Sequence, residues 1–354
     1  MNSSMPSLKP SRPSLVDLVQ RLASTLALSL LFASPLCAQT NFAGLTAAER
    51  ALGPDAPAYH ALQEGRVDEA ASLLRATLAS NAGDALAHQL LCRVFYVQDK
   101  ADDAIHQCEL AVSSAPAAGD LASNSHLWLG RAYGMKARHA GPIAGFTLAR
   151  KVAANFSRAV ELDPNNVAAL DDLGEYDVSA PSIVGGGNDK AHALASRMMP
   201  RFPASAHHLL ARIALAENNS SAAESEFKQA LAAEYSPETW IDLAQFYQTH
   251  GRADDALSAV RSAVAADRAH SPALVDAASI LTEAKRAPDL AERCLRDYLS
   301  SRAKSDAAPA FKVHLQLGKL LAARGDNPDA EREFAAAAAL ANDYTRNARS
   351  AQGH

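Results

Sequence analysis

Residues 240–263 decide the fold, and they read Trp-Ile-Asp-Leu-Ala-Gln-Phe-Tyr-Gln-Thr-His-Gly-Arg-Ala-Asp-Asp-Ala-Leu-Ser-Ala-Val-Arg-Ser-Ala. Bulky and small residues recur three or four positions apart through this stretch, at Trp240, Leu243, Ala244, Tyr247, Ala256, Val260 and Ala263. Residues so spaced share one face of a helix, and small residues let two helices approach closely. Gly251 interrupts the pattern and marks a turn. The stretch therefore predicts two helices packed as a hairpin.

The same arrangement recurs along the chain at intervals of roughly 32 to 39 residues. A turn residue followed by the first alanine of a second helix is found at Gly65 with Ala70, Asp99 with Ala104, Asn218 with Ala223, Arg286 with Ala291, and Gly325 with Ala330. Two further first helices are marked by Leu129, Gly130 and Tyr133, and by Leu170, Leu173 and Gly174. About eight units are expected between residues 51 and 345.

This pattern resembles the tetratricopeptide repeat (TPR) family. The resemblance implies an all-α, right-handed superhelical solenoid, because a single helix pair cannot bury its apolar face and must stack on its neighbours. It also implies a noncatalytic scaffold that binds a protein or peptide in a concave groove lined by the first helices. From the register, the groove residues are predicted to be Gln89, Arg93, Tyr96, Arg131, Asp171, Glu175, His208, Arg212, Gln245 and Gln248. Their mixed charge suits an extended peptide.

Two units are longer than the others, with insertions at about residues 134–150 and 179–190. Both are expected in the turn between first and second helix, so that they meet at one edge of the solenoid. Residues 121–160 contain six basic side chains and no acidic one. The insertions therefore form a candidate anion site comprising Lys136, Arg138, Arg150, Lys151, Gly185, Gly186, Gly187 and Lys190.

The function of this edge has alternative interpretations. One is a binding module for a small anionic ligand or a cell-wall fragment. The other is a structural loop, in which the glycines at Gly185 to Gly187 only satisfy positive φ angles. For the protein as a whole, an envelope enzyme is a further hypothesis. The sequence contains no nucleophile elbow, kinase signature or dinucleotide-binding motif that would support it.

Histidines occupy the position of Trp240 in four units, as His88, His126, His207 and His314. No metal site is expected from them, because packed helices lie about 8–10 Å apart whereas zinc ligands must approach within about 2 Å of the ion. Cys92 and Cys108 fall on facing helices of one unit. They either form a disulfide or pack as small buried side chains. No cofactor is expected.

The N-terminus is predicted to be a signal peptide over residues 1–38, and the alternatives are an uncleaved anchor and lipidation at Cys37. Leu22 to Phe32 form an apolar run preceded by three basic residues, and the run is too short for the roughly 20 residues of a membrane span. Pro35 and Ala38 indicate cleavage before Gln39. The protein is then periplasmic or secreted, without an integral membrane span. Residues 39–50 are expected to form a cap, and residues 346–354 to fray.

Composition narrows the class of partner. The chain has 354 residues, of which 48% are hydrophobic, 21% charged and 6% aromatic, and alanine is about a fifth of the total. The net charge is −5, and residues 1–38 hold three basic side chains against one acidic, which leaves −7 for the rest. Such an acidic chain argues against nucleic acid as the partner. Nothing in the sequence fixes the oligomeric state.

Overall fold

The computed structural model describes residues 53–346, all of which belong to one compact unit, Cys37–His354. The predicted signal peptide, the predicted cap over residues 39–50 and the last eight residues lie outside this range. The described part is all-helical, with no strand. Its elements are η1 (Gly53–Asp55), α3 (Ala56–Gln63), α4 (Val67–Ser80), α5 (Ala85–Val97), α6 (Ala101–Ser114), α7 (Asp120–Ala137), α8 (Pro142–Leu162), α9 (Val167–Ser179), η2 (Ser182–Val184), α10 (Asn188–Met198), α11 (Pro203–Ala216), α12 (Ser220–Ala233), α13 (Pro237–Thr249), α14 (Ala253–Ala266), α15 (Ala273–Glu283), α16 (Pro288–Ser300), α17 (Ala310–Ala323) and α18 (Asn327–Leu340).

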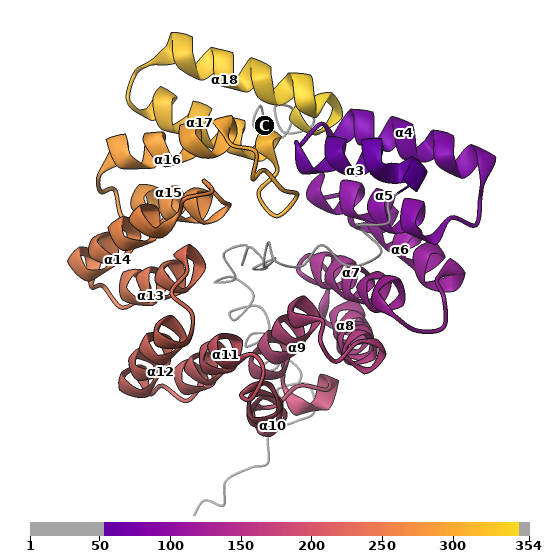
Figure 1. Cartoon of the computed structure of the whole chain (residues 1–354), viewed down its shortest axis with the longest axis horizontal. Coiled ribbons are helices and arrows are strands. Elements are labelled where there is room, and N and C mark those ends of the chain that lie inside the picture. The colour runs from indigo at the N-terminus through magenta and orange to yellow at the C-terminus, as the bar shows by residue number, and fades with distance from the viewer. Residues whose placement is uncertain (1–52, 347–354) are drawn as a thin grey trace, which may run out of the picture. The chain divides into compact units, whose positions relative to one another are not determined.

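The helices pack as consecutive antiparallel pairs, from α3 with α4 to α17 with α18 (Figure 1). The odd-numbered first helices also contact each other, as α5 does with α7, α9 with α11, and α13 with α15. Stacking in this way covers the apolar stripe that each pair leaves open. The predicted solenoid of TPR-like helix pairs is therefore confirmed.

The turns inside the pairs share one backbone geometry, which explains their sequence signature. A residue with positive φ follows the first helix at Gly65 (76°), Asp99 (59°), Asn218 (59°), Gly251 (71°) and Gly325 (84°). In each turn the next amide donates to a carbonyl five residues back, for example Arg252 N to Tyr247 O at 2.9 Å. This is the usual left-handed helix cap, which favours glycine and tolerates Asn and Asp.

The seventh unit corrects the predicted turn position. Arg286 was expected to hold the turn, but the positive φ is at Lys285 (51°). Arg286 N instead donates to Leu281 O at 2.9 Å, in the place that Arg252 takes in the sixth unit. The unit holds one extra residue, Ala287, which also has a positive φ (43°) before α16 begins. Counting back from Ala291 by the standard interval therefore gives a position one residue too late.

The first insertion lengthens helices more than it lengthens the turn. Helices α7 and α8 have 18 and 21 residues, against 13 and 14 in α5 and α6. Only residues 138–141 connect them, because Gly141 and Pro142 provide a strong helix start. The expectation that the added residues all lie in the turn was wrong for this unit. In the second insertion, η2 and three glycines precede α10, which begins at Asn188.

Histidine contacts measure the length of the first insertion. The Nδ1 atoms of His88, His207 and His314 each lie 2.6–2.8 Å from a polar side chain 19 residues later, on the second helix of the same pair. The partner of His126 is Asn155, 29 residues later. The ten-residue difference is the insertion. These histidines join the two helices of a pair, as expected for packing residues.

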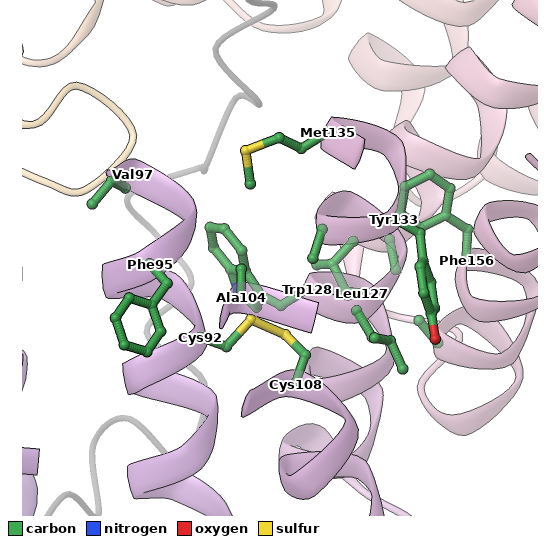
Figure 2. Packing of buried hydrophobic residues seen from close by; sticks show 14 of the residues in the cluster. Cys92, Phe95, Val97, Ala104, Cys108, Leu127, Trp128, Tyr133, Met135 and Phe156 are labelled. Carbon is green, nitrogen blue, oxygen red and sulfur yellow. A yellow bond between two sulfur atoms is a disulfide. The ribbon is translucent and has the colours of Figure 1, made fainter. Parts of the chain in front are cut away.

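Close helix contacts depend on the small residues of the pattern. A Cβ atom on Gly130 would lie 2.5 Å from the Phe156 ring, and one on Gly318 would lie 2.5 Å from the Phe334 ring. In the second unit Cys92 takes the same place, and its Sγ lies 1.97 Å from Cys108 Sγ in a disulfide (Figure 2). Of the two alternatives for this pair, the structure has the bridge.

The last unit packs on the first. Phe311 of α17 and Ala341 belong to the same buried cluster as the side chains of α3 to α11. Gly65 makes room for α17, because a Cβ atom there would lie 2.7 Å from Ala310 N. Asn342 N donates to Asp68 Oδ2 at 2.8 Å. The two ends of the helix-pair array therefore contact each other, with α18 beside α4 in Figure 1.

Candidate binding surfaces

The predicted groove residues lie on five consecutive first helices, and we call these ten residues together the first-helix wall. They come from α5, α7, α9, α11 and α13. Because consecutive first helices contact each other, side chains at equivalent positions of neighbouring units come within reach. The structure thus brings these residues together as neighbours, and it also assigns most of them a partner.

Ion pairs cross from one first helix to the next along this wall. Arg131 of α7 donates to Asp172 of α9 at 2.6 Å. Arg212 of α11 donates to both carboxylate oxygens of Glu175 of α9, at 2.9 and 2.7 Å. The alternating charges from which peptide recognition was predicted therefore form ion pairs between neighbouring first helices.

Arg93 makes the corresponding pair across the two ends of the array. Its Nε donates to Asp306 Oδ2 at 2.8 Å, and both side chains are only 5–6% exposed. Gln63 Nε2 donates to the same carboxylate at 3.1 Å, and the guanidinium lies over the Trp128 ring at 5.2 Å. Burial opposes ionisation of Asp306, but the Arg93 charge and these hydrogen bonds outweigh it and lower the pKa of the carboxyl.

An acidic group without such a strong partner lies at the centre of the wall. Burial raises the pKa of Asp171 to about 7, the charge of His208 opposes the rise, and neighbouring Asp172 adds to it. His208 Nδ1 lies 2.9 Å from Asp242 Oδ2. Burial works against the His208 cation, yet Asp242 raises the pKa of the imidazole overall. The charge on Asp171 therefore depends on pH near neutrality, and the neighbouring His208 cation favours its ionised form.

Neutral polar groups on the wall keep binding capacity. Gln245 and Gln248 of α13 are half-buried, and within the described chain neither side-chain amide has a hydrogen bond. Gln89 is buried with its Oε1 atom unsatisfied. Tyr96 is half-buried and packs edge-to-face on Trp128, with ring centroids 5.4 Å apart. An amide carries both a donor and an acceptor, so it can bind a peptide backbone.

The insertions lie against each other, as predicted. Tyr176 Oη is 2.8 Å from the carbonyl oxygens of both Ala149 on α8 and Val184 on η2. Gly187 N donates to Asp177 O at 2.7 Å. Gly186 is required for space, because a Cβ atom there would lie 2.1 Å from Ala180 O. At Gly185 (φ 106°) and Gly187 (φ 131°) the backbone is left-handed.

The predicted anion residues divide into two groups. Lys136 is ion-paired with Asp102, and Lys151 donates to Tyr133 Oη at 3.3 Å. Arg150 and Lys190 instead line an open hollow of about 380 Å³ between α8 and η2, with Gly185 at its edge. Arg138 is exposed at the end of α7, outside the hollow. The structure therefore brings together Arg150, Gly185 and Lys190, and it separates them from Lys136.

Acidic partners of the wall residues were missed from the sequence, among them Asp242 and Asp306. Asp242 follows Ile241 on α13, so its proximity to His208 could be found only by setting the registers of two units side by side. Asp306 lies in the segment between α16 and α17, where no helical period points to a direction. Neither position has a signal of its own in the repeat.

Metal and membrane chemistry have no built site in the part of the chain that is described. No cluster of three or more His, Cys, Asp or Glu side chains is placed to hold a metal ion between residues 53 and 346. In the same range no helix is long and apolar enough to cross a membrane. The remaining described cysteine, Cys294, is buried, and burial raises the pKa of its thiol to about 11.

Comparison with known proteins agrees with this architecture. A family model for the middle TPR-like domain of cilia and flagella-associated protein 70 matches residues 207–342, which span α11 to α18. The crystal structure of yeast Tom70 is similar at a TM-score of 0.50 with 17% identity, over 95% of this chain and 70% of that one. No curated protein matches the sequence.

Two further solved structures have the same kind of repeat at lower similarity. TTC0263, a TPR protein of Thermus thermophilus, has a TM-score of 0.43 and 20% identity over 65% of this chain and 98% of that one. The C-terminal part of a TPR repeat-containing protein from Cytophaga hutchinsonii has a TM-score of 0.39 and 13% identity over 70% of this chain and 95% of that one. The protein is an all-α solenoid of TPR-like helix pairs. A fold of this kind suggests protein partners.

Proposed function

We propose that the protein is a noncatalytic scaffold that binds an extended segment of a protein partner on its first-helix wall. The observation that carries this proposal is the contrast along the wall between paired charges and unpaired amides. Arg131 and Arg212 are committed to Asp172 and Glu175, whereas Gln245 and Gln248 have no internal partner in the described chain.

The paired charges and the amides have different roles in this proposal. Each ion pair ties one first helix to the next and fixes the distance between them. The amides of Gln245 and Gln248 project from a surface so fixed, and each can donate to a carbonyl and accept from an N–H of a bound backbone. Tyr96 offers a ring face or edge to an apolar side chain. Binding would then depend little on the sign of the partner's charge at these positions.

Site-specific photo-crosslinking in cells of the source organism tests the wall. A photoreactive phenylalanine derivative replaces Gln248 in one strain and Arg261, an exposed residue of α14, in another. The Gln248 position should give a discrete protein adduct that the Arg261 position does not. The adduct should weaken several-fold when Gln245→Ala is added. Equal adducts at both positions, or none at Gln248, would argue against the wall as the binding surface.

We also propose that the scaffold acts in the bacterial envelope after export. This part rests on the sequence alone: basic residues, the apolar run Leu22 to Phe32, and small residues before Gln39. Cell fractionation followed by N-terminal sequencing tests it directly. The periplasmic fraction should contain the protein with Gln39 as its first residue. A cytoplasmic protein that retains residues 1–38 would contradict this proposal without affecting the wall.

A further inference from the structure

Three of the four large apolar side chains that are exposed among the described residues lie on the two insertions. Among the described residues, the large apolar side chains exposed to solvent are Ile143 (86%), Phe146 (38%), Ile183 (62%) and Tyr235 (70%). The first two lie on the first turns of α8, and Ile183 lies on η2, which packs against α8. Isolated exposed apolar residues are ordinary, but a cluster on paired insertions indicates an interaction site.

Helical spacing aligns these residues with the hollow. Ile143, Phe146 and Arg150 are three and four positions apart, so they share the solvent-facing side of α8. The same side continues into the hollow at Ala153, Ala154 and Ser157, while Ile183 and Lys190 form the opposite bank. An apolar strip therefore leads into a hollow with a cation on each side.

The charge at this edge is positive and mostly uncompensated. Arg150 is exposed and has no ion pair in the described chain, and Lys190 donates only to the Gly185 carbonyl. The acidic groups nearby include Asp189, which is exposed, Asp177, which is buried, and Glu217, which lies 3.5 Å from the Asn188 amide. Burial raises the pKa of Asp177 to about 6, and the charge of Lys190 opposes the rise. Lys136 and Arg158 do not contribute, because Asp102 and Glu161 pair with them.

We propose that the edge formed by the two insertions is a second docking surface, which takes an acidic segment of a partner protein through one apolar side chain flanked by carboxylates. The apolar side chain enters the hollow over Ala153 and Ala154, and the carboxylates meet Arg150 and Lys190. A small anion would use the cations and leave Ile143, Phe146 and Ile183 without a role. A flat lipid surface would not fill a hollow of about 380 Å³.

Three labelled dodecapeptides test the proposal on the full chain by fluorescence anisotropy: one alternating leucine and glutamate, one leucine and glutamine, and one leucine and lysine. The glutamate peptide should bind at least tenfold more tightly than the other two. The double variant Arg150→Glu with Lys190→Glu should weaken it at least tenfold, as should Ile143→Ser with Phe146→Ser. Matched controls are Arg261→Glu with Arg268→Glu, and Tyr235→Ser, which should stay within twofold of the unaltered chain.

Each alternative result overturns the proposal. Equal binding of the glutamate and glutamine peptides would show that the negative charge of the peptide does not contribute to its affinity. Equal weakening by the control variants would place the site elsewhere. Binding of none of the peptides would reject an acidic peptide as the occupant. Two further probes apply if the glutamate peptide does not bind. Sedimentation with phosphatidylglycerol vesicles that depends on Arg150 and Lys190 would assign the edge to a lipid surface. Binding of inorganic phosphate that depends on the same two residues would assign it to a small anion.

Discussion

Arg93 and Asp306 are 213 residues apart in the chain, and two hydrogen bonds join their side chains, from Nε to Oδ2 at 2.8 Å and from Nη2 to Oδ1 at 3.0 Å. This buried pair links the second helix pair to the segment before the last one. Lys312 and Asp99 add an exposed pair at 3.0 Å across the same contact. Burial makes Arg93 and Asp306 sensitive to the loss of either partner, since a lone buried charge cannot be solvated.

We therefore expect Asp306→Ala to destabilise the protein by about 3–5 kcal/mol, because Arg93 would remain buried without its carboxylate. The double variant Arg93→Met with Asp306→Leu should recover most of that loss. Urea unfolding of Arg93→Met, of Asp306→Leu and of the double variant gives the coupling energy. Additive effects of the two changes would show that the pair does not join the ends of the array.

The disulfide between Cys92 and Cys108 should contribute measurable stability. It closes a loop with a sequence separation of 16, for which chain entropy predicts about 3 kcal/mol. Replacing both residues by alanine and adding reductant to the unaltered chain should lower the thermal midpoint by similar amounts. Alkylation in denaturant without reductant should label Cys294 and leave Cys92 and Cys108 unlabelled. Cys294→Ala is the matched control and should not respond to reductant differently from the unaltered chain.

Two glycine-to-alanine changes should have opposite signs. Gly251 has φ 71° and open space around its Cβ position, so alanine there meets only backbone strain and should cost about 1 kcal/mol. Gly145 lies inside α8 with an ordinary helical backbone, and Gly145→Ala should stabilise by about 0.5–1 kcal/mol. Chemical denaturation of both variants checks the pair. The same sign for both would show that turn geometry is not what selects Gly251.

The pKa of Asp171, raised to about 7, predicts a pH dependence of stability. A carboxyl with a folded pKa above its unfolded value is best tolerated when protonated. The contribution of the protonated Asp171 carboxyl to the free energy of unfolding is fully present at pH values below about 4. It is lost as the pH rises through about 7. Asp171→Asn should therefore stabilise the protein at pH 8 by about 1–2 kcal/mol, a figure reduced because the side chain is partly exposed.

Urea unfolding at pH 5 and at pH 8 checks this prediction for Asp171. The gain from Asp171→Asn should shrink at the lower pH, where the native carboxyl is largely protonated. Asp103→Asn, at an exposed carboxylate of α6, is the control and should show no such difference. A gain independent of pH would attribute the effect to something other than ionisation.

The helix pairs could be predicted from the sequence because their signals are local. Each unit repeats its own spacing of small and bulky residues, and the cap geometry at Gly65, Gly251 and Gly325 demands glycine or a tolerant substitute. In the seventh unit the turn position predicted from the usual interval was wrong, because one added residue, Ala287, moves the turn by one position. The length of the first insertion was predictable, but its division was not, because α7 continues to Ala137 and α8 begins only at the Gly141 and Pro142 start signal.

The candidate sites were predicted less completely, for a related reason. Helical register indicates which positions of neighbouring first helices Arg93 and Arg131 occupy, but it does not reveal which carboxylate lies opposite each of them. That depends on how neighbouring units stack and, for Asp306, on a segment without any period. The edge residues Arg150 and Lys190 were predicted from the sequence. The ion pair of Lys136 with Asp102 could not be predicted, because it depends on the distance between side chains of neighbouring units.

Linear repeat proteins lose structure most readily at their termini, since an outermost repeat has only one neighbour. Here the outermost pairs are neighbours of each other, through Gly65 against Ala310 and Asn342 against Asp68. No pair in the described range is left with a single supporting partner. Deleting the final pair would thus expose two surfaces in place of one, and fraying from either terminus would first have to break the contact with the other.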